Sequence, residues 1–174
     1  MAELIWGTAV NSFEESEREC HKMENKFTEI MQIGLIARDR ESVINSMREV
    51  FGEDPSQIMK TLKDENNRYY GNLGDFEAEL IFYRFANIEL EFIIPMSGKS
   101  IWQDFLEEHG EGLHHLLFNV DSFDGAKTQM AANNIGIAQQ GVSVFKVPGL
   151  KWAYFDLKDK LPFIAEIRNA KEVM

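Results

Sequence analysis

The stretch LHHLLFNV, residues Leu113–Val120, has the length and apolar character of a buried strand. Asp121–Asn134 follows it with apolar residues at helical spacing, and Gly136 lies just past the end of that helix. Further strand-like runs cover 135–145, 152–157 and 162–167. The second half of the chain therefore predicts the order strand, helix, strand, strand, strand.

The first half of the chain has the same order of elements. Ile30–Ala37 (IMQIGLIA) is typical of a strand, and Asp39–Gly52 has helical spacing with residues suited to cap it at both ends. Strands are expected over Gln57–Lys63 and in two runs within Glu77–Pro95, and a short amphipathic helix is expected over Ser100–Glu108. A repeat at this scale changes the expected fold.

The repeat predicts an α+β protein in which two paired β-α-β-β-β modules form a cup-shaped sheet. We expect the modules over residues 28–97 and 113–168, joined by a helix within 98–112. Residues 1–27 form an acidic extension that we expect to be helical, and 169–174 form a tail. The halves share few identical residues, so the repeat depends on the order of elements. Unpaired strands at the module ends favour a homodimer.

Composition limits the partners of the chain. Its 174 residues include 18 basic and 29 acidic side chains, which give a net charge of -11. No two basic residues are adjacent, which argues against binding nucleic acid or an anionic membrane. Cys20 is the single cysteine, no apolar run has the length of a membrane span, and Met1–Val10 lacks the basic residues typical of a signal peptide. We therefore expect a cytoplasmic protein.

Four polar side chains stand in apolar strand patterns, at Gln32, Glu91, His115 and Glu166. Side chains alternate between the two faces of a strand, so one face is built for burial under helices and the other presents the polar residue. Gln32 and His115 lie on the first strand of their modules, and Glu91 and Glu166 on the last. Pairing of the modules about a pseudo-twofold axis would bring all four together.

These four side chains supply three oxygens and one nitrogen, a set that suits a divalent ion such as Zn, Ni, Co or Mn. The two carboxylates would balance the charge of the ion. Each residue alone is more typical of a solvated or structural side chain, but four at equivalent positions of a repeat favour a common site.

Two stretches also resemble a known family. They are FLEEHGEGLHHLLFNVDSFDGA, residues 105–126, and IELEFIIP, residues 88–95. The chain resembles the vicinal oxygen chelate superfamily over residues 28–168. That superfamily includes glyoxalase I (lactoylglutathione lyase), methylmalonyl-CoA epimerase, extradiol dioxygenases and bleomycin-resistance proteins. The local sequence is most similar to the epimerases, and the resemblance implies the glyoxalase-like fold.

The resemblance places the metal ligands of the family on Gln32, Glu91, His115 and Glu166. Epimerases and bacterial glyoxalases usually have His at the first position, whereas animal glyoxalase I has Gln there. Gln32 therefore argues against extradiol dioxygenase chemistry, which uses two His and one Glu. Bleomycin-resistance relatives generally lack the ligands.

The activity implied is a metal-dependent lyase or isomerase reaction, with proton transfer next to a carbonyl through a metal-stabilised enediolate. The resemblance favours Glu166 as general base and Glu91 as a second acid or base. Glu79 and Glu89 lie near the equivalent of a further epimerase glutamate, and neither is assigned.

The substrate expected is a small molecule, such as a thioester or hemithioacetal. Arg84, Lys146 and Lys151 are candidates to bind its anionic groups. One alternative is a metal-free protein that binds a small molecule such as a drug. Another is a regulatory protein that uses residues 1–27 for contact.

Overall fold

The computed structural model describes residues 25–144, 149–157 and 159–169. The acidic extension expected over residues 1–27 lies almost wholly outside these ranges. Lys146, a candidate to bind an anionic group, also lies outside them. The described strands form one ten-stranded sheet in the order β2-β5-β6-β1-β7-β10-β9-β8-β3-β4. The strands are β1 (Phe27–Ile36), β2 (Gln57–Lys60), β3 (Arg68–Tyr69), β4 (Asn72–Leu73), β5 (Glu77–Arg84), β6 (Glu89–Ser97), β7 (Gly112–Val120), β8 (Ile137–Val142), β9 (Lys151–Asp156) and β10 (Ile164–Arg168).

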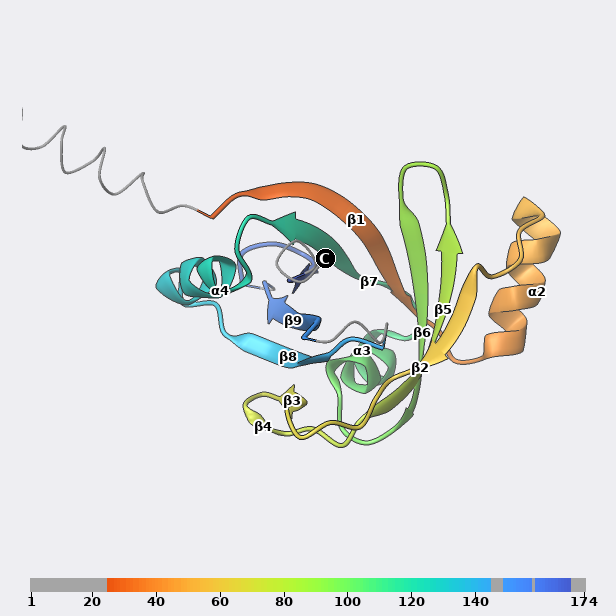
Figure 1. Cartoon of the computed structure of the whole chain (residues 1–174). Helices are drawn as coiled ribbons and strands as arrows, with labels where there is room; N and C mark the ends of the chain where they lie inside the picture. Colours follow the sequence, from red (N-terminus) through yellow and green to blue (C-terminus); the bar gives the residue numbers. More distant parts are fainter. Residues whose placement is uncertain (1–24, 145–148, 158, 170–174) are drawn as a thin grey trace, which may run out of the picture.

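The two halves of the sheet have the same topology. In the first half β1 pairs in parallel with β6, and β5 and β2 follow outward. In the second half β7 pairs in parallel with β10, and β9 and β8 follow outward. The antiparallel pair β1–β7 joins the halves, and the sheet curls around them (Figure 1). The predicted fold of two paired β-α-β-β-β modules in a cup-shaped sheet is confirmed.

Three helices, α2 (Arg40–Phe51), α3 (Ile101–His109) and α4 (Phe123–Ala132), lie within the described ranges. Each begins after a residue whose side-chain oxygen accepts from a backbone N–H in the first turn, as for Asp39 and the N–H of Ser42 at 2.7 Å. Gly52 ends α2 in the left-handed conformation, with φ of 71°. None of these helices has the length and apolar character needed to cross a bilayer.

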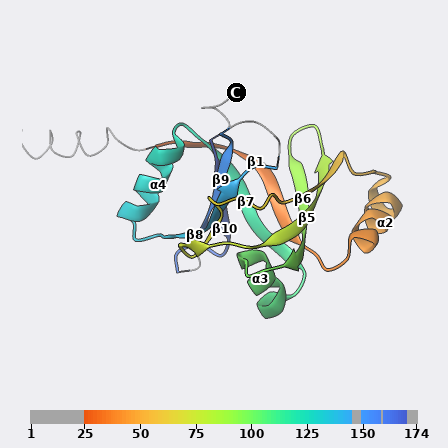
Figure 2. The same cartoon turned by 60° about the horizontal axis from the view of Figure 1, so that its bottom comes forward.

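The helices that the structure describes cover the outer face of the sheet at its two ends. Val43 and Met47 of α2 pack with Ile81, Tyr83 and Ile94 of β5 and β6. Helix α4 covers β9 and β10 at the opposite end of the molecule (Figure 2).

The expectation that each strand buries one face under a helix is therefore wrong for β1. Met31 on its outer face is 40% exposed, because β1 lies in the middle of the sheet, between the two covering helices.

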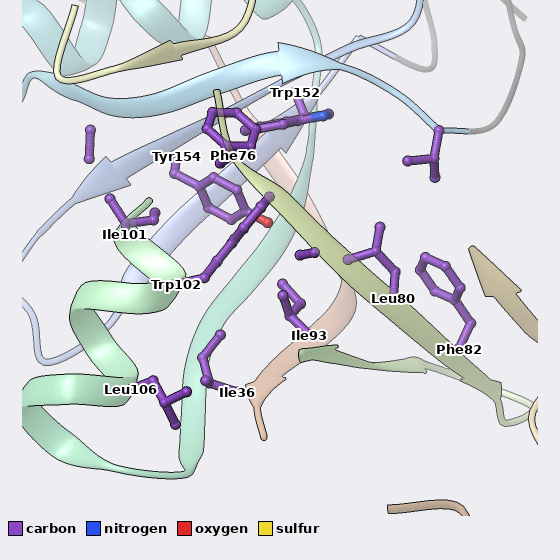
Figure 3. Close-up of a cluster of buried hydrophobic side chains, with 13 residues drawn as sticks. Ile36, Phe76, Leu80, Phe82, Ile93, Ile101, Trp102, Leu106, Trp152 and Tyr154 are labelled. Atoms are coloured by element: carbon purple, nitrogen blue, oxygen red, sulfur yellow. The ribbon is translucent and has the colours of Figure 1, made fainter. Parts of the chain in front are cut away.

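The inner face of the cup carries a large apolar cluster. Trp152 and Tyr154 of β9 lie close to Trp102 of α3 and to Phe76, the residue before β5, and the centroids of neighbouring rings are 5.3–6.0 Å apart (Figure 3). Leu80 and Phe82 of β5 and Ile93 of β6 belong to the same cluster. Side chains from both halves thus meet inside the cup and hold its shape.

The short strands β3 and β4 were not predicted. Residues 61–76, which we call the crossing segment, leave β2 at one edge of the sheet and reach β8 in the other half, where β3 pairs with it (Figure 1). The backbone N–H of Tyr70 donates to the carbonyl of Ala138 at 2.7 Å, and the hydroxyl of Tyr69 donates to Asp104 of α3 at 2.7 Å. The segment thus ties the two halves together across the cup.

Candidate metal centre

Three ligand-type side chains converge inside the cup. Glu91 on β6, His115 on β7 and Glu166 on β10 each present one atom, and these atoms lie within 4.8 Å of one another. Nε2 of His115 is 3.0 Å from Oε2 of Glu166 and 3.5 Å from Oε2 of Glu91. All three residues are buried. The parallel pairing of β6 with β1 and of β10 with β7 brings them together from positions far apart in the sequence.

A β-bulge sets the direction of His115. Gly34 of β1 pairs with His115 and Leu35 pairs with Leu113, so His114 is the extra residue between them. The bulge interrupts the alternation of faces, and both histidines are consequently buried. Their Nδ1 atoms are 3.0 Å apart, so one ring donates to the other and fixes its orientation. The bulge explains why His114 departs from the apolar pattern of its strand face.

Burial and charge act against each other at the centre. Burial lowers the pKa of His115, but Glu166 and Glu91 outweigh burial and raise that pKa to about 9. Burial raises the pKa of Glu91 above its ordinary value, and His115 opposes this shift. For His114, burial and then the charge of His115 lower the pKa well below its ordinary value. Two buried carboxylates beside one imidazole carry an excess of negative charge that a cation would neutralise.

The donor atoms fit a divalent ion. Nε2 of His115 and Oε2 of Glu166 are buried without a well-directed hydrogen bond, although they are only 3.0 Å apart. Two ligand atoms bound at about 2.1 Å, with an angle of about 90–110° at the ion, are about 3.0–3.4 Å apart. The separations of 3.0 and 3.5 Å match that requirement. The Glu-His-Glu group can therefore hold an ion of this kind.

Gln32 is the fourth predicted residue, and it lines the same cavity as Glu91 and Glu166. Its Nε2 donates to Oε1 of Glu89 at 2.7 Å, and Arg84 holds the other oxygen of Glu89 at 3.1 Å. A carboxylate only accepts, so the nitrogen of the amide must face Glu89. Oε1 is then the atom of Gln32 that is left for the cavity.

The cavity beside these residues is small and mostly apolar. It holds about 30 Å³ for solvent, room for about two water molecules. Thr61 and Leu62 of the crossing segment line it, together with the aromatic residues of the inner cluster. Tyr154 also lines the cavity, with its ring 4.9 Å from that of His115. Burial, and then the charge of Glu166, raise the pKa of the Tyr154 phenol well above its ordinary value.

The other residues considered from the sequence lie in different places. Glu79 pairs with Arg40 at 3.2 Å, on the face of β5 opposite to the cup. Lys151 lines a separate cleft with Arg68 and Lys127.

Sequence reasoning missed Arg168, which lines the cavity with Gln32 and Glu91. It also missed Gly34, whose position inside an apolar strand was the available indication.

Residues 31–154 match the family model of the Glyoxalase/Bleomycin resistance protein/Dioxygenase superfamily, over more than half of the chain. The chain belongs to this superfamily. No curated protein is similar enough to the chain to count as a match. The match confirms the resemblance to the vicinal oxygen chelate proteins that the sequence indicated.

Several solved structures share the fold of this chain, among them the following three. A methylmalonyl-CoA epimerase in complex with methylmalonyl-CoA and NH4+ has 15% identity and a TM-score of 0.62, over 85% of this chain and 98% of that one. A Streptomyces coelicolor methylmalonyl-CoA epimerase with 2-nitronate-propionyl-CoA has 15% identity and a TM-score of 0.60, over 82% of this chain and 94% of that one. The Mycobacterium tuberculosis methylmalonyl-CoA epimerase has 13% identity and a TM-score of 0.57, over 80% of this chain and 85% of that one. At such identities the likeness concerns the fold.

Proposed function

We propose that the protein is a metal-dependent lyase or isomerase of the glyoxalase or epimerase type, which moves a proton between positions next to a carbonyl group. The observation that carries this proposal is the buried convergence of Glu91, His115 and Glu166, whose ligand-type atoms lie within 4.8 Å of one another. A mostly apolar cavity borders the two carboxylates, which is the kind of setting in which small-molecule substrates bind.

Gln32, Glu91, His115 and Glu166 would hold one divalent ion, with Zn, Ni, Co and Mn as the candidates. When bound, such an ion supplies Lewis-acid stabilisation of negative charge that develops on a carbonyl oxygen. Nδ1 of His115 then donates to Nδ1 of His114 and keeps Nε2 directed at the carboxylates, which is the usual support of a ligating histidine.

The proton transfer itself falls to the carboxylates. Glu166 is the general base in this proposal, because it lines the cavity and its Oε2 has no well-directed hydrogen bond. Glu91 is the second acid or base, because its buried carboxylate lines the same cavity. The aromatic side chains around the cavity, among them Trp102 and Trp152, make its walls mostly apolar.

The first experiment is metal analysis of the purified protein, before and after reconstitution with Zn, Ni, Co or Mn. We expect about one ion per chain, and loss of that ion in His115→Ala. His109→Ala is the matched control, because His109 is 61% exposed on α3 and should leave the metal content unchanged. A protein that binds none of these ions after reconstitution would overturn the proposal and favour the metal-free binding protein.

If the ion is present, activity is assayed with methylglyoxal–glutathione hemithioacetal and with methylmalonyl-CoA. Exchange of the substrate α-proton with deuterium reports the proton transfer directly, even where the products cannot be separated.

A further inference from the structure

Arg168 is a cation that lines the cavity and lies outside the proposed set of metal ligands, although its charge acts on Glu91. It follows Glu166 by two residues on β10, so the two side chains lie on the same face of the strand. Ala165 and Ile167, on the other face, pack under α4. Arg168 is half-buried and lines the cavity together with Glu166.

Arg168 also differs from the other arginines that the structure describes. Each of the others donates to a carboxylate or to a backbone carbonyl, as Arg84 does to Glu89 at 3.1 Å. Within the described ranges, the guanidinium of Arg168 has no hydrogen bond and no ion pair. A guanidinium offers five N–H donors in a planar fork that fits a carboxylate. The donors of Arg168 are therefore available to a ligand in the cavity.

The charge of the site favours an anion at this position. The two carboxylates, Glu91 and Glu166, would balance a divalent ion, and Arg168 then makes the cavity net positive. The whole chain carries a net charge of -11, so this local excess of positive charge runs against the general composition.

We propose that Arg168 binds an anionic group of the substrate, and that the substrate class is a small carbonyl compound bearing a carboxylate. This inference rests on the proposed function, because the carbonyl is the group that would lie at the metal centre. Arg168 is then a specificity-determining residue: it selects the acid over its uncharged analogue. The walls of the cavity between these polar groups are mostly apolar, with Phe76 and Trp102 among the lining residues.

The test compares chelating probes that differ only in a carboxylate. Acetohydroxamate chelates a divalent ion through two neighbouring oxygens, and the monohydroxamates of malonic and succinic acid add a carboxylate at two spacings. Dissociation constants are measured by calorimetry on the Zn-loaded or Co-loaded protein. We expect at least one carboxylated probe to bind about tenfold more tightly than acetohydroxamate, which is the gain that one charge-assisted contact provides.

In Arg168→Gln this preference should disappear, while the affinity for acetohydroxamate stays within about twofold. Arg168→Lys should keep part of the preference, since the charge remains but the fork is lost. Lys151→Gln is the matched control, because Lys151 lies on the neighbouring strand and lines the separate cleft. Metal content and thermal midpoint are compared among the variants to show that each one is folded and loaded.

A carboxylate preference that survives in Arg168→Gln, or that is absent at both spacings in the unmodified protein, would overturn the inference alone. Failure of acetohydroxamate itself to bind the metal-loaded protein would instead overturn the proposed function, and the inference with it.

Discussion

Gly34 on β1 faces the imidazole of His115 on β7 so closely that a β-carbon on residue 34 would lie 1.8 Å from Cε1 of that ring. The atoms Nδ1 and Nε2 of the ring would be 2.2 and 2.3 Å away. No side chain fits there without displacing the ring. The absence of a side chain at Gly34 is thus a condition for the position of the central ligand.

Gly34→Ala should therefore displace His115 and weaken metal binding by at least about tenfold, the scale expected for mispositioning a ligating histidine. The overpacked strand should also lower the free energy of unfolding by about 1–3 kcal/mol. Calorimetric titration with Zn and chemical denaturation measure the two effects. Gly136→Ala is the control, since a β-carbon there meets nothing within 4 Å. Unchanged affinity for Zn in Gly34→Ala would contradict this account of His115.

Glu89 should matter for metal binding although it is not proposed as a ligand. Its carboxylate holds Nε2 of Gln32 at 2.7 Å and so determines which atom of the amide faces the cavity. Glu89→Gln removes this constraint, because a glutamine can donate as well as accept. We expect the affinity for Zn to fall by about tenfold, as for other residues that orient a ligand.

The matched control for Glu89 is Glu79→Gln, which removes a carboxylate from the neighbouring strand, on the face that points away from the cup. If both variants lower the affinity for Zn equally, the loss reflects the removal of negative charge in general. The proposal that Glu89 orients the amide of Gln32 would then be wrong.

Glu166→Gln should separate metal binding from catalysis. The amide oxygen keeps a ligand atom in place, but it has no basic carboxylate to accept a proton. We expect the variant to retain most of its metal and to lose about 10²–10⁴-fold in the rate of α-proton exchange, the range typical of a general base. Deuterium incorporation into the substrate, followed by NMR, gives the rate. Exchange at the unmodified rate would show that another group is the base.

The crossing segment should depend on the contact between Tyr69 and Asp104. The hydroxyl of Tyr69 donates to the carboxylate of Asp104 at 2.7 Å. Tyr69→Phe should lower the free energy of unfolding by about 1 kcal/mol. A double-mutant cycle with Asp104→Ala isolates the coupling between the two side chains, and a coupling near zero would contradict the role assigned to this contact.

The pH dependence of that contact follows from the pKa of Tyr69. Burial, and after it the hydrogen bond to Asp104, raise the pKa of the phenol to about 12, from 10 in the unfolded chain. A group with a raised pKa in the folded state stabilises the fold fully below its unfolded pKa and loses that contribution as the pH rises through the folded value. The penalty of Tyr69→Phe should therefore be constant from about pH 6 to 9. A penalty that changed across this window would point to a different titrating group.

Much of the fold follows from local features of the sequence. The helix over Asp39–Gly52 was predicted from its spacing and its caps, and the structure has α2 with Asp39 and Gly52 in those positions. Alternation along β6 and β10 predicted that Glu91 and Glu166 lie on the face opposite to the residues buried under α2 and α4. Helical spacing, capping and alternation are properties of neighbouring residues, so a single sequence displays them.

The crossing segment and the β-bulge at His114 were beyond such reasoning. Both depend on the pairing of strands that are far apart in the chain, as β3 pairs with β8. A two-residue strand has no periodicity to detect, and a bulge changes register without a distinctive residue type.

The sequence by itself determined the order of the elements that form the two modules, the repeat of these modules and the four polar residues on the inner strand faces. Only the tertiary structure decided which atoms approach one another across the sheet: Gly34 against His115, and Glu89 against Gln32. The physical reason is that alternation fixes the face on which a side chain lies, whereas its neighbours across the sheet are fixed by strand register, to which residues more than fifty positions apart contribute.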